Sequence, residues 1–201
     1  MTKDSPLEAL GNDPIALFQE WFDAAKKTGM DKPEAVNLST ATITGKVSSR
    51  IVLLKEVQGS GFVFFSNYNS RKAKDLQENA NAALTFFWNI LDREVRIEGM
   101  ISKISREESE KYFATRPRES QLGAWASHQS AVISSREELL VRYREYEELF
   151  LNKPVPCPDY WGGYKLTPEV IEFWQGQVGR LHDRFLFRKA ASGWTKSRLS
   201  P

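Results

Sequence analysis

The sequence is poor in the residues that build disulfide-held and metal-held scaffolds, since its 201 residues include one cysteine and two histidines. With Cys157 alone, no disulfide can form within the chain, which excludes a secreted scaffold held together by disulfides. His128 and His182 lie in unrelated contexts, so no metal site is expected. The sequence also lacks an excess of charge of one sign, because 28 Lys and Arg oppose 26 Asp and Glu for a formal net charge of +2. That balance argues against a bulk nucleic-acid or membrane-surface binder.

Long apolar runs and several enzyme motifs are missing as well. No stretch approaches the roughly 18 apolar residues that a membrane helix requires, and the first residues lack the apolar core of a secretory signal. We therefore expect a cytoplasmic protein with no membrane and no nucleic-acid partner. The sequence contains no Gly-x-Ser-x-Gly, no P-loop motif and no Gly-x-Gly-x-x-Gly, so those hydrolase and nucleotide sites are not indicated.

The hydrophobic pattern predicts one β-rich domain at residues 13–201, preceded by a loose, polar segment at residues 1–12. Asp13 and Pro14 mark a helix start, and apolar residues follow at helical spacing up to Gly29. Other helices are predicted from Ser70, at 105–115 and at 135–151, and strands at 36–43, 47–57, 62–65, 82–88, 93–104, 163–166, 170–175, 181–189 and 194–199. Short strands joined by tight turns favour a β-rich α+β fold, an antiparallel barrel or sandwich with flanking helices.

The first group of candidate site residues is Asn67-Tyr68-Asn69-Ser70-Arg71-Lys72, which lies where a predicted strand ends and a helix begins. Ser70 suits the N-cap position, where the first helical N–H groups lack partners. Arg71 and Lys72 add two cations at the positive end of the helix dipole, which a phosphate would stabilise. The alternative is an ordinary solvated first turn.

The second group is the apolar strand from Arg50 to Lys55, which has a cation at each end. A separation of five residues places the two cations on opposite faces of a regular strand. If both serve one site, a bulge or a strand end must re-aim one of them. The alternative is a strand whose end residues reach out to water.

The third group combines a phenol, a guanidinium and a hydroxyl. Tyr112 and Arg116 are four residues apart and share a helix face, while Pro117 is expected to end the helix and let Ser120 curl back. These groups can together hold the oxygens of a phosphate. The alternative is a helix end at which Arg116 bonds the last carbonyls.

The fourth group lies on a predicted strand near the C-terminus. Arg180, His182 and Arg184 alternate, so they share one face and repel one another unless an anion lies across them. Trp174 leads into this segment. With the cations at 50–55, 71–72 and 116–118, the arrangement predicts two phosphate-like sites and therefore two phosphorylated ligands.

Six motifs in register resemble the pyridoxine (pyridoxamine) 5′-phosphate oxidase family. They are Arg50-Ile-Val-Leu-Leu-Lys55, Ser70-Arg71-Lys72, Tyr112-Phe-x-x-Arg116-Pro-x-x-Ser120, Gln129-Ser130, Phe173-Trp174-Gln175-Gly176 and Arg180-Leu-His182-Asp-Arg184. The resemblance runs from about Asp13 to Pro201 and includes the final Arg198-Leu-x-Pro201. It implies a homodimeric, FMN-binding split β-barrel with an active site at each side of the dimer interface.

The resemblance also implies roles for individual residues. Arg50, Ile51, Val52, Leu53, Lys55, Phe65, Ser66, Arg71, Lys72 and Glu94 belong to its cofactor-binding set, and Gln129, Ser130, Trp174 and Arg184 are expected to reach FMN from the other subunit. Lys55, Tyr112, Arg116 and Ser120 are expected to clamp the substrate phosphate, with Arg180 and His182 over the pyridine ring as catalytic residues.

The implied reaction oxidises pyridoxine or pyridoxamine 5′-phosphate to pyridoxal 5′-phosphate, as in vitamin B6 salvage. A hydride passes from the C4′ carbon to the flavin, and O2 then reoxidises the flavin and yields H2O2. The protein's contribution would be positioning and charge stabilisation, because the flavin carries the redox chemistry.

The sequence departs from the family pattern at three places. Glu94 stands where the family usually has Gln, and its carboxylate disfavours an anionic reduced flavin unless it is protonated or paired with Arg93 or Arg96. Phe65 stands where some members have Tyr. Many members have an Arg-x-x-Tyr segment that covers the substrate, and residues 1–12 contain no such pair.

Two other hypotheses remain open. One is a related split-barrel flavin enzyme that acts on another ring, as in phenazine-type biosynthesis, although Tyr112, Arg116 and Ser120 favour a phosphorylated substrate. The other is a non-catalytic carrier of FMN or pyridoxal phosphate.

Overall fold

The computed structural model describes residues 11–201, so nearly all of the predicted loose segment lies outside the described residues. Over residues 11–201 the chain forms five α-helices and nine strands. The helices are α1 (Pro14–Lys26), α2 (Arg71–Glu78), α3 (Arg106–Thr115), α4 (Arg118–Ala126) and α5 (Arg136–Leu149). The strands are β1 (Ala35–Ala41), β2 (Val47–Leu53), β3 (Glu56–Gln58), β4 (Gly61–Asn67), β5 (Asn81–Trp88), β6 (Arg93–Lys103), β7 (Trp161–Gln175), β8 (Asp183–Ala190) and β9 (Gly193–Leu199).

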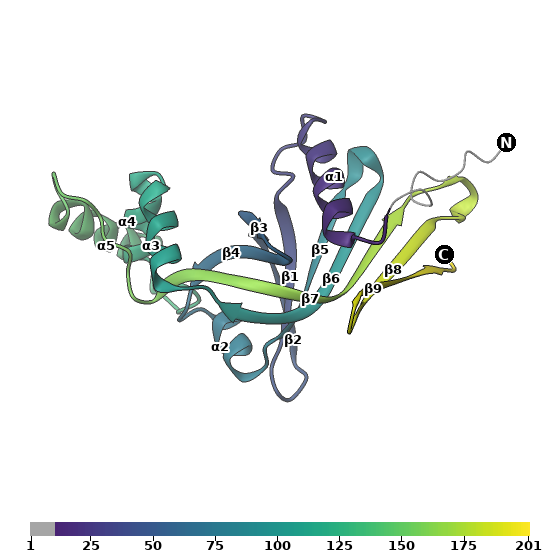
Figure 1. Cartoon of the computed structure of the whole chain (residues 1–201). Coiled ribbons are helices and arrows are strands. Elements are labelled where there is room, and N and C mark those ends of the chain that lie inside the picture. The colour runs from purple at the N-terminus through teal and green to yellow at the C-terminus, as the bar shows by residue number, and fades with distance from the viewer. Residues whose placement is uncertain (1–10) are drawn as a thin grey trace.

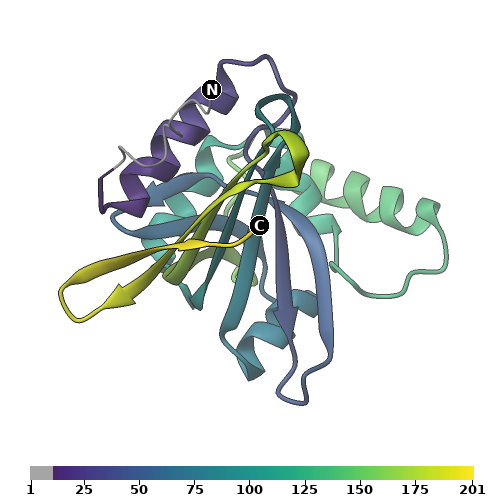
Figure 2. The same ribbon diagram turned by 90° about the vertical axis from the view of Figure 1, so that its right-hand side faces the viewer.

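All nine strands belong to one antiparallel sheet. The order is β2-β1-β5-β6-β7-β4-β3, and β8 also pairs with β7 and carries β9. The helices α3, α4 and α5 gather at one end of β7, and the β8–β9 hairpin extends from the other end (Figure 1). In the turned view the strands cross one another steeply, as in a sheet that curls toward a barrel (Figure 2).

The main core lies between α1 and the curled sheet. Asp13 caps α1 by accepting a hydrogen bond from the backbone N–H of Ile15 at 2.9 Å, as the sequence predicts. On the buried face of α1, the Phe18 ring packs edge-on against Phe62, with ring centroids 4.9 Å apart. Trp21 meets Phe173 of β7 in the same way at 5.2 Å. These contacts fix α1 against the centre of the sheet.

The strand β7 is continuous over 15 residues, whereas the sequence predicts two strands separated near Pro168. The pairing of β6 with β7 shifts register between Glu98 and Gly99, and Gly99 stands opposite Pro168. A Cβ at Gly99 would overlap the carbonyl oxygen of Thr167. A bulge opposite a glycine therefore accommodates the proline without ending the strand.

The segment predicted as one strand at 47–57 is divided into β2 and β3. The backbone N–H of Leu54 donates to the carbonyl of Glu34 at 2.9 Å, and that of Lys55 donates to Val63 on β4 at 2.8 Å. The chain thus leaves one edge of the sheet and joins the other between these two residues. This switch supplies the strand end that is needed if Arg50 and Lys55 are to reach one site.

A further helix, α4, occupies a segment for which the sequence predicts no helix. Pro117 ends α3 as expected, but α4 begins directly after it, since Pro117 stands at the N-cap of α4. Leu122 of α4 enters a second, smaller core with Phe113 and Trp161. Proline therefore separates two helices here rather than opening a loop.

None of the helices within residues 11–201 combines the length and the apolar character that crossing a membrane requires.

Candidate functional site

A cavity of about 330 Å³ opens between β2, β4, α2 and α3. Its lining residues are Arg50, Ile51, Val52, Leu53, Lys55, Phe65, Ser66, Asn67, Lys72, Tyr112, Arg116, Gln129 and Trp161. All of these except Trp161 belong to segments that the sequence singles out. Arg50, Lys55, Lys72 and Arg116 make the cavity strongly cationic, which suits an anionic ligand.

Lys72, at the start of α2, turns its amine into this cavity. The Nζ atom donates to Gln129 Oε1 at 2.6 Å and to Ser66 Oγ at 3.1 Å. Ser70 holds the N-cap position, but its hydroxyl donates to the carbonyl of Asn67 at 2.8 Å and does not cap the helix. Burial and the nearby charge of Arg50 lower the pKa of Lys72 to about 8. The amine is thus a desolvated cation that an anion would stabilise.

The lowered pKa of Lys72 predicts how stability depends on pH. Between about pH 8 and pH 10.5, Lys72 is neutral in the folded protein and charged in the unfolded chain. The unfolded state binds more protons over this window, so the free energy of unfolding increases with pH. We expect Lys72→Met to remove this contribution, as measured by urea unfolding at several pH values. Lys74→Met, at an exposed site on the same helix, is the control, and an equal change in both variants would contradict the assignment.

Arg116 brings a half-buried cation to the wall of the cavity. Its guanidinium lies 4.6 Å from the centre of the Trp161 ring, and burial lowers its pKa. Within residues 11–201, Nη1 is buried and has no hydrogen-bond partner. Beside it, the rings of Tyr112 and Phe65 stack at 3.9 Å. A buried N–H without a partner is costly, so this atom indicates a ligand oxygen.

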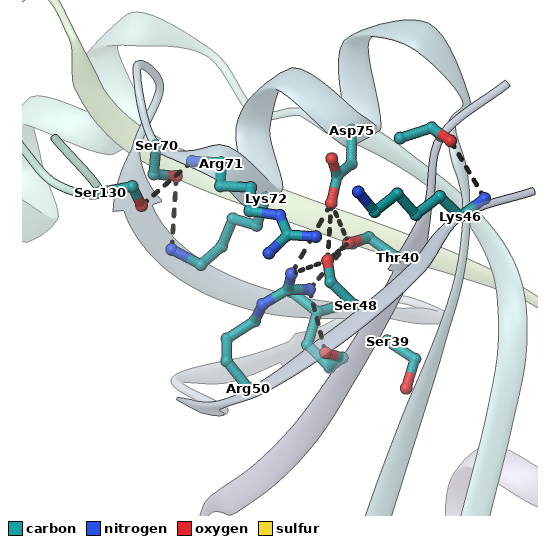
Figure 3. Close-up of polar contacts among 12 residues, drawn as sticks. Ser39, Thr40, Lys46, Ser48, Arg50, Ser70, Arg71, Lys72, Asp75 and Ser130 are labelled. Atoms are coloured by element: carbon teal, nitrogen blue, oxygen red, sulfur yellow. Dashed lines mark hydrogen bonds and ion pairs between the residues drawn. The ribbon is translucent and has the colours of Figure 1, made fainter. Parts of the chain in front are cut away.

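Arg50 is held at the edge of the cavity by neighbouring hydroxyls (Figure 3). Its Nη1 donates to Thr40 Oγ1 at 2.8 Å and its Nη2 to Ser48 Oγ at 2.6 Å. Lys55 reaches the same cavity from beyond the switch between β2 and β3. A strand end therefore brings the two cations to one cavity.

A second cavity, of about 460 Å³, adjoins the first on the other side of Gln129. Its lining residues are Asn67, Asn69, Arg71, Lys74, His128, Gln129, Ser130, Ala131 and Tyr160. Here the backbone N–H of Arg71 donates to Ser130 Oγ at 3.2 Å (Figure 3).

Gln129 and Ser130 thus lie against α2 of their own chain, although the resemblance implies that they act from the other subunit. The reason is that the chain leaving α4 passes over the end of β4 and the start of α2. There Asn67, the last residue of β4, donates to the carbonyl of Ser127 at 3.4 Å.

Ser120 differs from the other predicted phosphate ligands. It lies half-buried in the first turn of α4, and the cavity lining does not include it. The sequence predicts that Ser120 lies in a segment that curls back after Pro117, whereas it belongs to the first turn of α4.

The remaining predicted residues gather at the far end of β7. In the sheet, Trp174 stands between Glu94 of β6 and Arg184 of β8. The Trp174 ring lies 4.6 Å from the ring of His182. Arg184 donates through Nε to the buried Glu172 at 2.8 Å, which raises the pKa of Arg184.

Glu94 has a cationic neighbour in this far cluster. Its Oε1 lies 3.7 Å from Nε of Arg96, which also pairs with Glu172. From the sequence, Arg93 and Arg96 are the two partners that could offset the negative charge of Glu94, and the structure shows the pairing with Arg96.

Arg180 and His182 do not lie on the predicted strand, because β8 begins only at Asp183. Arg180 has a φ of 61° and ends a short 3₁₀ turn, and His182 accepts a hydrogen bond from the backbone N–H of Gln177 at 3.1 Å. The predicted face of three alternating cations is therefore wrong. A left-handed backbone at Gly179 and Arg180 turns the chain before the strand starts.

The two groups of site residues are too far apart to meet within one chain. Trp161 lines the cationic cavity, and Trp174 lies 13 residues further along the continuous strand β7. At about 3.3 Å per residue this is roughly 40 Å along the strand. A single ligand can contact both groups only if a second copy supplies one of them.

Comparison with known proteins supports this reading of the fold. Residues 22–150 match the family model "Pyridoxamine 5'-phosphate oxidase", and residues 161–201 match "Pyridoxine 5'-phosphate oxidase C-terminal dimerisation region". A pyridoxine/pyridoxamine 5′-phosphate oxidase of Psychromonas ingrahamii is 53% identical over 190 residues, covering 94% of this chain and 88% of that protein. A probable pyridoxamine 5′-phosphate oxidase of Schizosaccharomyces pombe is also 53% identical, over 90% of this chain and 80% of that protein.

Solved structures share the architecture. PhzG from Burkholderia lata, in complex with tetrahydrophenazine-1-carboxylic acid, is 28% identical with a TM-score of 0.93, covering 100% of this chain and 98% of that one. A pyridoxamine 5′-phosphate oxidase-related, FMN-binding protein from Nostoc punctiforme has 13% identity and a TM-score of 0.76, over 96% of this chain and 100% of that one, which shows the fold alone. The predicted split-barrel fold is confirmed. The chain belongs to the pyridoxamine 5′-phosphate oxidase family and is an oxidoreductase.

Proposed function

We propose that the protein binds FMN and oxidises pyridoxine or pyridoxamine 5′-phosphate to pyridoxal 5′-phosphate, with O2 as the final acceptor and H2O2 as a product. The observation that carries this proposal is the buried Nη1 of Arg116, which has no partner within residues 11–201 and belongs to a residue that lines a cavity with three further cations. Such a site favours a small phosphorylated ligand over an uncharged one.

The cavity residues fit both phosphorylated molecules. Arg50, Ile51, Val52, Leu53, Phe65, Ser66, Lys72 and Gln129 line it and are proposed to hold FMN, with Arg71 and Ser130 reaching in from the adjoining cavity. FMN, when bound, supplies the electron acceptor that no side chain provides. Lys55, Tyr112 and Arg116 are proposed to bind the substrate phosphate, while Ser120 would have to turn toward it from α4.

We propose that the working unit is a homodimer in which each site combines two protomers. Trp174, Arg184 and Glu94 would approach the flavin, and Arg180 and His182 would lie over the substrate ring as its catalytic residues. Roughly 40 Å of β7 between the two groups supports this arrangement. Residues 13–201 would act as one domain, because β7 pairs with strands from both family regions. With one cysteine and no possible internal disulfide, we place the protein in the cytoplasm.

One assay tests the proposal against its alternatives. The purified protein is incubated with FMN, freed of excess flavin, and mixed with pyridoxine 5′-phosphate while H2O2 is followed. We expect a yellow protein that releases H2O2 only when the phosphorylated substrate is present.

Each alternative gives a different result. A yellow protein that releases no H2O2 would support a non-catalytic carrier, and a protein that takes up no FMN would exclude both flavin enzymes. The structural likeness to PhzG makes a reduced phenazine precursor the comparison substrate. Turnover of that compound alone would favour the related flavin enzyme.

A further inference from the structure

Asp75 is a buried carboxylate that does not line the cationic cavity but lies directly behind it. It stands on α2, with 5% of its surface exposed. Its Oδ2 atom accepts hydrogen bonds from Thr40 Oγ1 at 2.7 Å and from Ser48 Oγ at 2.8 Å. Figure 3 shows that both hydroxyls lie between this carboxylate and the guanidinium of Arg50. Asp75 is therefore connected to the cavity residue Arg50 mainly through the hydroxyls of Thr40 and Ser48.

The ionised carboxylate determines which way these hydroxyls point. A carboxylate only accepts hydrogen bonds, so Thr40 and Ser48 must each direct their single O–H toward Asp75. Their oxygen lone pairs are then left to accept from Arg50, whose Nη1 and Nη2 bond them at 2.8 Å and 2.6 Å. The carbonyl of Leu38 accepts a further bond from Nη1 at 3.1 Å. These bonds hold the guanidinium in one orientation.

The charges around Asp75 also support its link to Arg50. Asp75 Oδ2 lies 3.7 Å from Nη2 of Arg50, and Arg71 and Lys72 place two more cations on the same helix. Burial alone would raise the pKa of Asp75, but the hydrogen bonds from Thr40 and Ser48 and the charge of Arg50 lower it overall. Asp75 is thus the negative charge that offsets a crowded group of cations while leaving their ligand side open.

We propose that Asp75 is a positioning residue, which fixes the guanidinium of Arg50 for FMN through the hydroxyls of Thr40 and Ser48. The proposal rests on the proposed function, because it takes FMN to be the ligand. It assigns Asp75 no contact with FMN. Its effect on FMN binding must therefore pass through Arg50.

The test is a double-mutant cycle read out as the Kd for FMN, measured by quenching of flavin fluorescence in the apo-protein. Asp75→Asn keeps the shape of the side chain, but its amide can donate to the hydroxyls of Thr40 and Ser48 and so turn their O–H groups toward Arg50. We expect the Kd for FMN to rise about tenfold, because the charge-assisted hydrogen bonds from Arg50 to these hydroxyls are then disturbed. In an Arg50→Met background the same substitution should change Kd less than about twofold. Glu78→Gln removes an exposed carboxylate from the same helix and should leave Kd unchanged.

Two results would overturn the proposal. One is an unchanged Kd in Asp75→Asn. The other is an equal loss with and without Arg50, which would indicate a general effect on the fold. Should Asp75→Asn not fold, Ser48→Ala replaces it in the cycle. Its increase in the Kd for FMN should be smaller and must again disappear in the Arg50→Met background.

A second measurement separates this proposal from the proposed function. Should the wild-type protein bind no FMN, the proposed function fails. Crystal structures of apo wild type and apo Asp75→Asn then decide the role of Asp75. A guanidinium that leaves Thr40 and Ser48 in the variant supports positioning of Arg50, and one that stays in place overturns it.

Discussion

Replacing Arg116 with methionine is expected to lower kcat/KM for pyridoxine 5′-phosphate by roughly 100- to 1,000-fold, as the loss of charge-assisted hydrogen bonds to a phosphate predicts. The loss should appear mainly in KM, because the phosphate is held alike in the substrate and in the transition state. The thermal stability of the apo-protein should stay the same or increase. Methionine removes a buried N–H that has no partner within residues 11–201 and keeps contact with the Trp161 ring.

The matched control for this substitution is Arg118→Met. Arg118 lies two residues away and donates to the backbone carbonyls of Phe150 and Lys153 at 2.6 Å and 2.9 Å. The Arg118→Met variant should be less stable to thermal unfolding but should keep the wild-type KM for pyridoxine 5′-phosphate. Steady-state kinetics and thermal unfolding of both variants make the comparison. Equal KM values in wild type and Arg116→Met would remove Arg116 from the phosphate site.

Mixing two variants that are each nearly inactive at a substrate concentration far below the KM of Arg116→Met should restore activity if each site is shared between protomers. One variant carries Arg116→Met and the other Arg184→Gln. In a mixed dimer, one site receives both substitutions and the other receives neither. Random mixing makes about half of the dimers mixed, so about a quarter of the wild-type activity should return.

The mixture is prepared by refolding the two variants together, and H2O2 release is compared with that of each variant refolded alone. The control is a double variant that carries both substitutions in one chain. Refolded alone, it should stay inactive. If the mixture is as inactive as its components, both groups of residues act within one chain or serve different sites.

The sequence predicts the cationic cavity well because local patterns report local chemistry. The segment from Arg50 to Lys55 and the pair Tyr112 and Arg116 are recognisable from charge and spacing alone, and all four residues line one cavity. Trp161 also lines it but carries no such signal. Trp161 reads as an ordinary apolar residue at a strand start, and only packing shows it beneath a guanidinium.

The sequence is less informative where one element depends on a distant partner. Pro168 argues for a break between two strands, and only the opposing Gly99 reveals that a bulge keeps β7 continuous. Pro117 is equally ambiguous, because it can end one helix and precede another. The turn at Gly179 and Arg180 depends on a left-handed backbone, which strand periodicity does not report.

Asp75 shows the same limit for the site. In sequence it is one carboxylate among 26 acidic residues, on a short helix with no motif. Its partners Thr40 and Ser48 lie 35 and 27 residues away on other elements. Only the folded chain makes these three residues a single unit.

The continuity of β7 has a consequence for how this protein can vary in evolution. Surface loops tolerate inserted residues, but a single residue inserted between Gly163 and Phe173 would turn every later side chain to the opposite face of the sheet. Phe173 would leave the core, and the residues that stand opposite β8 would exchange faces. Changes in length should therefore accumulate outside this strand, while its residue count stays fixed across descendants of the chain.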